Sequence, residues 1–171
     1  MKVIKAKTAG FCFGVKRAVD TVYKQVDTKC GQIYTYGPII HNEEVIKDMR
    51  DKGVIVLRSE EDLDMISQGT VIIRSHGVEK RIYEKIEQKG LRIVDATCPF
   101  VKKIHNIVSE KSGEGFHIII IGNPEHPEVV GIKGWAKDNV TVIQSAEDAE
   151  CFTADRKAVS YTHLTLPTIL R

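Results

Sequence analysis

The chain has 171 residues, of which 42% are hydrophobic and 28% are charged, a composition that excludes a largely disordered protein. A net charge of +2 provides no strong electrostatic attraction to nucleic acid or to a membrane surface. The densest apolar runs, such as Ile118–Ile121, are far shorter than the ~20 residues of a membrane-spanning helix. The N-terminus lacks the apolar core of a secretory signal. We therefore expect a cytoplasmic protein that binds neither nucleic acid nor membrane.

Short β-branched runs alternate with amphipathic stretches along the chain. The predicted strands are, in chain order, residues 2–6, 32–36, 54–58, 70–74, 91–94, 117–121 and 140–143. The predicted helices are residues 15–25, 43–52, 80–89, 99–109, 128–136 and 146–152. Alternation at this spacing predicts an α/β fold of repeated βα units with small parallel sheets.

The order of these units predicts two lobes. A second set of βα units begins near Asp95–Cys98, so the first α/β lobe covers residues 1–97 and an incomplete second lobe covers residues 98–160. Residues 161–171 contain no acidic residue and no amphipathic period. We expect this last segment to be a tail that is not native to the fold.

Four cysteines stand at positions 12, 30, 98 and 151. In a reducing compartment a thiol is more often buried, metal-bound or catalytic than disulfide-bonded. The sequence has no Cys-x-x-Cys pair, so the fold would have to assemble any metal site from separate segments. Cys30 and Cys151 are interpreted as small buried apolar residues. Cys12, in contrast, precedes the helix predicted to start near Val15, and Cys98 directly precedes the helix predicted to start at Pro99.

Several chemically versatile side chains occupy predicted strand-to-helix junctions, namely Cys12, His41, His76, Cys98, His126 and Glu128. Such junctions line the carboxyl edge of a parallel sheet, where ligands bind and helix N-termini favour phosphate. Imidazoles can bind a diphosphate, thiolates can bind iron, and a carboxylate can transfer protons. Each residue taken alone is also compatible with a helix cap or a surface position. Spacing alone therefore predicts an anion or metal site in an α/β protein.

Five short segments at these junctions form a recognisable series. They are Ala9–Val15 (AGFCFGV), Gly37–Asn42 (GPIIHN), Arg74–Val78 (RSHGV), Asp95–Pro99 (DATCP) and Gly122–Val129 (GNPEHPEV). In this order they resemble the motifs of the LytB/IspH family of 4-hydroxy-3-methylbut-2-enyl diphosphate reductases. The resemblance covers about residues 1–160 and implies roughly two of the three lobes of a trefoil-like reductase.

The resemblance also implies a 4Fe–4S cluster held by three cysteines. Cys12 and Cys98 would be two of its ligands, and the third cysteine ligand is absent from this chain. His41, His76 and His126 would bind the substrate diphosphate. His126 and Glu128 would be the catalytic residues, with Glu128 in the network that delivers protons.

The implied reaction is the two-electron reductive dehydroxylation of 4-hydroxy-3-methylbut-2-enyl diphosphate. Its products are isopentenyl and dimethylallyl diphosphate, at the last step of the non-mevalonate route of isoprenoid biosynthesis. A ferredoxin or flavodoxin would supply the electrons. Beyond Ser160 the sequence departs from the family's Gln-Thr-Thr-like loop and continues as Tyr161-Thr162-His163. We therefore expect a truncated chain that is inactive as a reductase on its own.

Two other functions are compatible with the same residues. A non-catalytic α/β module could bind a phosphorylated metabolite through its histidines and helix N-termini, in which case Cys12→Ser would have only a mild effect. A structural zinc or iron protein could use Cys12, Cys98 and a histidine. A nucleotide-dependent dehydrogenase is disfavoured, because no Gly-x-Gly-x-x-Gly follows the first predicted strand.

Overall fold

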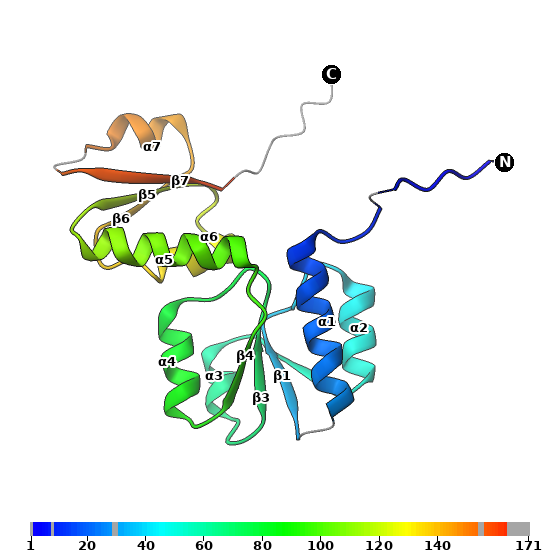
Figure 1. Ribbon diagram of the computed structural model, residues 1–171. Coiled ribbons are helices and arrows are strands. Elements are labelled where there is room, and N and C mark those ends of the chain that lie inside the picture. The colour runs from blue at the N-terminus through cyan, green and yellow to red at the C-terminus, as the bar shows by residue number, and fades with distance from the viewer. Residues whose placement is uncertain (1, 8, 29–30, 154–155, 164–171) are drawn as a thin grey trace. The chain divides into compact units, whose positions relative to one another are not determined.

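The computed structural model describes residues 2–7, 9–28, 31–153 and 156–163 (Figure 1). Helices and strands alternate, and every strand pairing is parallel. In chain order the elements are α1 (Phe13–Thr28), β1 (Ile33–Tyr36), α2 (Glu43–Asp51), β2 (Val54–Leu57), α3 (Glu60–Asp64), β3 (Thr70–Ile73), α4 (Lys80–Gln88), β4 (Arg92–Asp95), α5 (Pro99–Gly113), β5 (His117–Ile121), α6 (Pro127–Lys133), β6 (Val140–Ile143), α7 (Ala146–Cys151) and β7 (Ala158–Thr162). The predicted α/β class with small parallel sheets is confirmed.

The chain divides into two compact units. One consists of Met1–Ser75 with Leu91–Cys98, and the other of His76–Gly90 with Pro99–Arg171. The sequence-based division placed residues 1–97 in one lobe. The structure instead groups residues 76–90, which contain α4, with the second unit.

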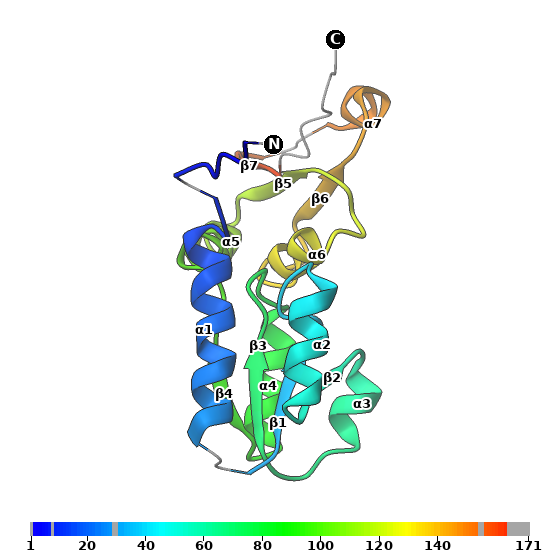
Figure 2. The ribbon, with the colours of Figure 1, turned by 90° about the vertical axis from the view of Figure 1, so that its right-hand side faces the viewer.

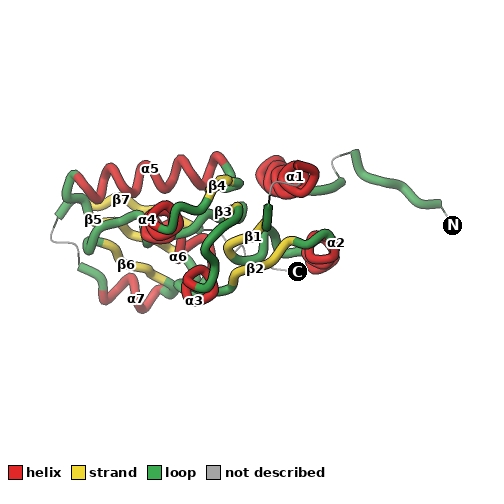
Figure 3. Tube along the Cα trace, turned by 90° about the horizontal axis from the view of Figure 1, so that it is seen from below, coloured by secondary structure: helices red, strands yellow, loops and turns green. Residues whose placement is uncertain are grey.

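The first unit is built on a four-stranded sheet with the order β2-β1-β3-β4. Helices α1 and α2 lie on one face of this sheet and α3 lies on the other (Figures 2 and 3). Ala18, Val19 and Val22 recur at helical spacing on α1 and pack in one core with residues of β1 and β3. Strand β3 is buried at all four positions, as expected for an inner strand of a parallel sheet.

The second unit is built on a three-stranded sheet with the order β6-β5-β7. Helices α5 and α6 lie on one face, and the short helix α7 lies on the other (Figures 1 and 3). Ile118 and Ile120 of β5 form the centre of the core together with Val108 of α5 and with Val129 and Ile132 of α6. This packing fixes α6, whose N-terminus carries one of the predicted site residues.

Three local predictions were wrong. Residues 2–6 form no strand, because the extended segment pairs with no other strand among the described residues. Helix α3 was not predicted, although Ser59 caps it by accepting from the amide of Asp62. Tyr161 and Thr162, assigned to the tail, pair with β5 as the end of β7; residues 164–171 of that tail lie outside the described residues.

Among the described helices, none combines the length and apolar character that a bilayer-spanning segment requires.

Candidate functional site

The two predicted metal ligands of the first unit belong to segments that meet at Gly14. Cys12 directly precedes α1, and its carbonyl accepts from the amide of Lys16 at 2.9 Å to begin the helix. Cys98 follows β4 and directly precedes α5. A Cβ placed on Gly14 would lie 2.6 Å from the Cys98 Sγ. The missing side chain at Gly14 therefore makes room for the Cys98 thiol against the first turn of α1.

Hydrogen bonds connect the loops at the carboxyl edge of this sheet. The amide and Oγ of Ser75 both donate to the carbonyl of Ile39, at 3.3 and 3.1 Å. The amide of Cys98 donates to the carbonyl of Ser75 at 2.9 Å. The segments that precede His41 and follow β4 are therefore fixed to the end of β3, where the parallel topology brings them together.

His41 lies between β1 and α2 and lines a cavity of about 780 Å³. This volume lies in the range typical of small-molecule sites. Its basic lining residues are His41, Lys47, Arg50, Arg58 and Arg74. The Arg74 guanidinium packs against Gly37, where a Cβ would lie 2.6 Å from its Nη1, and burial lowers the pKa of Arg74. The acidic Glu43 and Glu44 also line the cavity, so its charge is mixed with an excess of basic groups.

In the second unit the structure brings His76 and His126 together. Their ring centroids are 5.9 Å apart at an interplanar angle of 85°. His126 caps α6, because its Nδ1 accepts from the amide of Glu128 at 3.2 Å. An accepting Nδ1 assigns the proton of the neutral ring to Nε2. His126 can therefore donate through Nε2 to an anion.

Glu128, in the first turn of α6, contacts two residues that the sequence analysis placed in the tail. The Tyr161 hydroxyl donates to Glu128 Oε1 at 2.8 Å, and His163 Nε2 lies 3.8 Å from Oε2. Burial and then the bond to Glu128 raise the pKa of Tyr161. The rings of His126 and His163 are 4.2 Å apart. The alternation of the larger apolar Val159 and Tyr161 with the small polar Ser160 and Thr162 is a strand signal that could have revealed this contact, and in the structure Val159 and Tyr161 pack against the core.

The predicted site residues are shared between the units. Cys12, His41 and Cys98 belong to the first, and His76, His126 and Glu128 belong to the second. In the part of the chain that the structure describes, no group of three or more His, Cys, Asp or Glu side chains is arranged to hold a metal ion. Cys151 is exposed at the end of α7, so its interpretation as a buried residue was wrong. Cys30 lies outside the described residues.

Two thiols and an imidazole thus lie at strand-to-helix junctions of the first unit, and two imidazoles and a carboxylate lie at such junctions of the second. The family model described as LytB protein matches residues 3–168. The chain belongs to the LytB family, as its motifs predicted.

Curated relatives with similar sequences are named 4-hydroxy-3-methylbut-2-enyl diphosphate reductase. The relative from Caldanaerobacter subterraneus subsp. tengcongensis is 46% identical over 167 residues, which are 97% of this chain and 58% of the relative. The relative from Alkaliphilus oremlandii is 48% identical over 149 residues, 86% of this chain and 52% of the relative. The chain thus spans a little over half the length of these relatives.

Solved structures agree with this assignment. The E-1-hydroxy-2-methyl-but-2-enyl-4-diphosphate reductase of Plasmodium falciparum has a TM-score of 0.86 at 31% identity, over 95% of this chain and 51% of that one. A second structure, of (E)-4-hydroxy-3-methyl-but-2-enyl diphosphate reductase, has a TM-score of 0.72 at 39% identity, over 85% of this chain and 52% of that one.

Proposed function

We propose that this chain provides cluster ligands and diphosphate-binding residues for the reductive dehydroxylation of 4-hydroxy-3-methylbut-2-enyl diphosphate to isopentenyl and dimethylallyl diphosphate. The observation that carries this proposal is the approach of the Cys12 and Cys98 segments at Gly14. Relatives and structural neighbours that bear the reductase name support it.

Cys12 and Cys98 are proposed as two thiolate ligands of a 4Fe–4S cluster. The residues fit this group, because cysteine thiolates are the usual ligands of such clusters and the missing Cβ at Gly14 lets the Cys98 Sγ lie against the first turn of α1, directly after Cys12. Both thiols are free, and Cys12 is exposed. When bound, such a cluster supplies electrons and an open iron site for the substrate hydroxyl. A ferredoxin or flavodoxin is the proposed source of the electrons.

The histidines are proposed to bind the substrate diphosphate. His126 donates through Nε2, because its Nδ1 already accepts from the amide of Glu128. His76 lies beside it, and His41 provides a third imidazole from a cavity rich in basic groups. Hydrogen bonds from such donors to phosphate are charge-assisted and orient the substrate.

Glu128 is proposed to hold and transfer a proton near the substrate. Its side chain is only 16% exposed and is held by the Tyr161 hydroxyl, so its carboxylate has a defined orientation. A positioned carboxyl group of this kind is suited to general acid–base catalysis, in which its protonated form donates the proton and its carboxylate form takes one up. The hydrogen bond from the Glu128 backbone amide to His126 Nδ1 places the proposed proton-transferring residue beside a proposed diphosphate-binding residue at the N-terminus of α6.

Titration calorimetry with 4-hydroxy-3-methylbut-2-enyl diphosphate tests the binding role. We expect His41→Ala and His126→Ala each to weaken binding by roughly tenfold or more, because each removes a charge-assisted bond. His117→Ala is the matched control, since His117 lies in β5 and pairs with Thr141 away from these junctions. No binding to the wild-type chain, or equal weakening by His117→Ala, would contradict the proposal.

A non-catalytic phosphate-binding module would show the same dependence on histidines without taking up iron. Iron uptake by the wild-type chain and by Cys12→Ser separates these two functions. The expectation that these 171 residues are inactive on their own stays a prediction, and a turnover assay with a chemical reductant checks it.

A further inference from the structure

Arg17 connects α1 to the loop that ends at Cys98. Its Nη1 donates to the carbonyl of Thr97 at 2.9 Å and its Nη2 to the carbonyl of Asp95 at 3.3 Å. Arg17 lies on the same helix that begins directly after Cys12. One partly buried side chain thus joins the two cysteine segments across about 80 positions of sequence.

The geometry of the loop explains why an arginine is needed there. Asp95 Oδ1 accepts from the amide of Thr97 at 3.0 Å, and this turn presents the carbonyls of Asp95 and Thr97 to the same guanidinium. A planar guanidinium offers two donors in a fixed fork, whereas a lysine ammonium is a single charged centre on a flexible stem. Lysine at this position could reach one carbonyl but would not hold both.

The described hydrogen bonds of the Cys98 loop divide between the end of β3 and α1, and those to α1 come from Arg17. The hydrogen bond from the Cys98 backbone amide to the Ser75 carbonyl fixes the loop to the end of β3. Gly14 permits the thiol to approach α1 but exerts no attraction. Arg17 therefore provides the hydrogen bonds that draw the loop toward the helix.

We propose that Arg17 is a positioning residue that sets the spacing of the Cys12 and Cys98 thiols for iron–sulfur cluster assembly. It acts through the backbone carbonyls of Asp95 and Thr97, which precede Cys98 in the chain. The inference rests on the proposed cluster ligands, but whether Arg17 holds the loop before Cys98 can be measured without a cluster.

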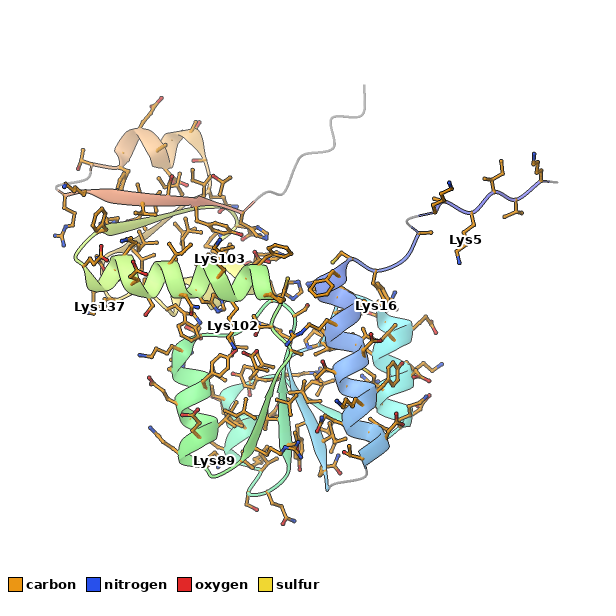
Figure 4. All side chains as sticks on the ribbon, viewed as in Figure 1. Lys5, Lys16, Lys89, Lys102, Lys103 and Lys137 are labelled. Carbon is orange, nitrogen blue, oxygen red and sulfur yellow. The ribbon has the colours of Figure 1, made fainter. Side chains whose placement is uncertain are left out.

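The first test compares cluster assembly in Arg17→Met, Arg17→Lys and Lys16→Met. Each chain is incubated anaerobically with Fe²⁺, sulfide and excess dithiothreitol, whose thiols complete the iron coordination, and bound iron and visible absorption are measured after desalting. We expect Arg17→Met to bind at least roughly threefold less iron, because both bonds to the loop are lost, and Arg17→Lys to recover part of it. Lys16, exposed beside Arg17 on α1, is the matched control and should behave as wild type (Figure 4).

The second test measures amide hydrogen exchange in residues 95–98 and alkylation of Cys98 by iodoacetamide, both without metal. Arg17→Met should accelerate both by roughly tenfold, whereas Lys16→Met should leave them unchanged. Wild-type exchange and alkylation rates in Arg17→Met, or wild-type iron uptake by it, would overturn the inference. If Arg17→Met does not fold, the same comparisons on Arg17→Lys decide.

These measurements also separate the inference from the proposed function. If the wild-type chain assembles no cluster, the proposed ligand role of the cysteines fails, while exchange and alkylation still decide whether Arg17 holds the loop. If the wild-type chain assembles a cluster and Arg17→Met assembles the same amount, the cysteine assignment stands and the role of Arg17 is refuted.

Discussion

Gly14 shows how the absence of one side chain can determine a site. The alternative residue, alanine, would place its Cβ 2.6 Å from the Cys98 Sγ and 3.0 Å from the Cys98 Cβ, so the loop or the helix would have to move. We expect Gly14→Ala to lower the free energy of unfolding by about 1–3 kcal/mol, the usual cost of overpacking. Urea denaturation measures this change.

Gly113→Ala is the matched control. Gly113 ends α5, and nothing lies within 4 Å of a Cβ added there. Alanine should stabilise this helix position by up to about 1 kcal/mol. A Gly14→Ala variant as stable as Gly113→Ala would contradict the close approach of Cys98 to α1.

The hydrogen bond of Tyr23 makes the free energy of unfolding depend on pH. Its hydroxyl donates to Asp48 Oδ2 at 2.6 Å, and this bond, with burial, raises the pKa of Tyr23 to about 12. The free tyrosine pKa is about 10, so the native state favours the protonated form. The contribution of this hydrogen bond to the free energy of unfolding is therefore fully present below about pH 10 and is lost as the pH rises from about 10 to about 12.

The difference in unfolding free energy between wild type and Tyr23→Phe, followed by denaturation from pH 9 upward, measures this effect. We expect the difference to shrink above about pH 10. The control is the same Tyr23→Phe comparison in an Asp48→Asn background, where the hydroxyl has no carboxylate to donate to and the pH dependence should be smaller. A constant Tyr23 difference across this range would refute the Asp48 bond.

At the scale of elements, α6 positions two histidines. Its N-terminus is capped by His126, while its C-terminal end contacts the segment that follows His76. The Trp135 Nε1 donates to the carbonyl of Val78 at 2.9 Å, and Gly134 lies directly against Glu79. The distance between the two imidazoles is thus set by a single short helix.

Gly134→Ala tests this arrangement, because its Cβ would lie 2.4 Å from both Cβ and Cγ of Glu79. We expect a loss of about 1–3 kcal/mol in unfolding free energy and displaced NMR signals of the His76 ring. Gly131→Ala, on the same helix, is the control, since its nearest contacts would be at 3.6 Å and thus ordinary. Equal effects of the two substitutions would show that α6 does not position the segment after His76.

At the scale of the whole molecule, the sequence predicted the repeated βα units and the placement of the site residues at junctions. The spacing of hydrophobic residues predicts these elements well, because buried parallel strands and amphipathic helices each have a distinct hydrophobic pattern. It failed at residues 2–6, whose strand-like composition finds no partner strand in the part of the chain that the structure describes. It also missed α3, which is only five residues long and is marked mainly by its Ser59 cap.

The contacts of the site could not be predicted in the same way. The approach of Cys98 to Gly14, the reach of Arg17 to Thr97, and the bond from Tyr161 to Glu128 all join residues distant in sequence. Such contacts depend on the packing of particular helices against particular sheets, which one sequence does not specify through local propensity.

Cluster assembly in cysteine variants tests the central claim most directly. Wild type, Cys12→Ser, Cys98→Ser and Cys151→Ser are incubated anaerobically with Fe²⁺, sulfide and excess dithiothreitol, and bound iron and sulfide are counted. We expect Cys12→Ser and Cys98→Ser each to bind roughly tenfold less iron, because a thiolate ligand is lost. Cys151, exposed on α7, is the matched control and should have no effect. Undiminished iron in Cys12→Ser and Cys98→Ser, or its loss in Cys151→Ser, would contradict the assignment of the site.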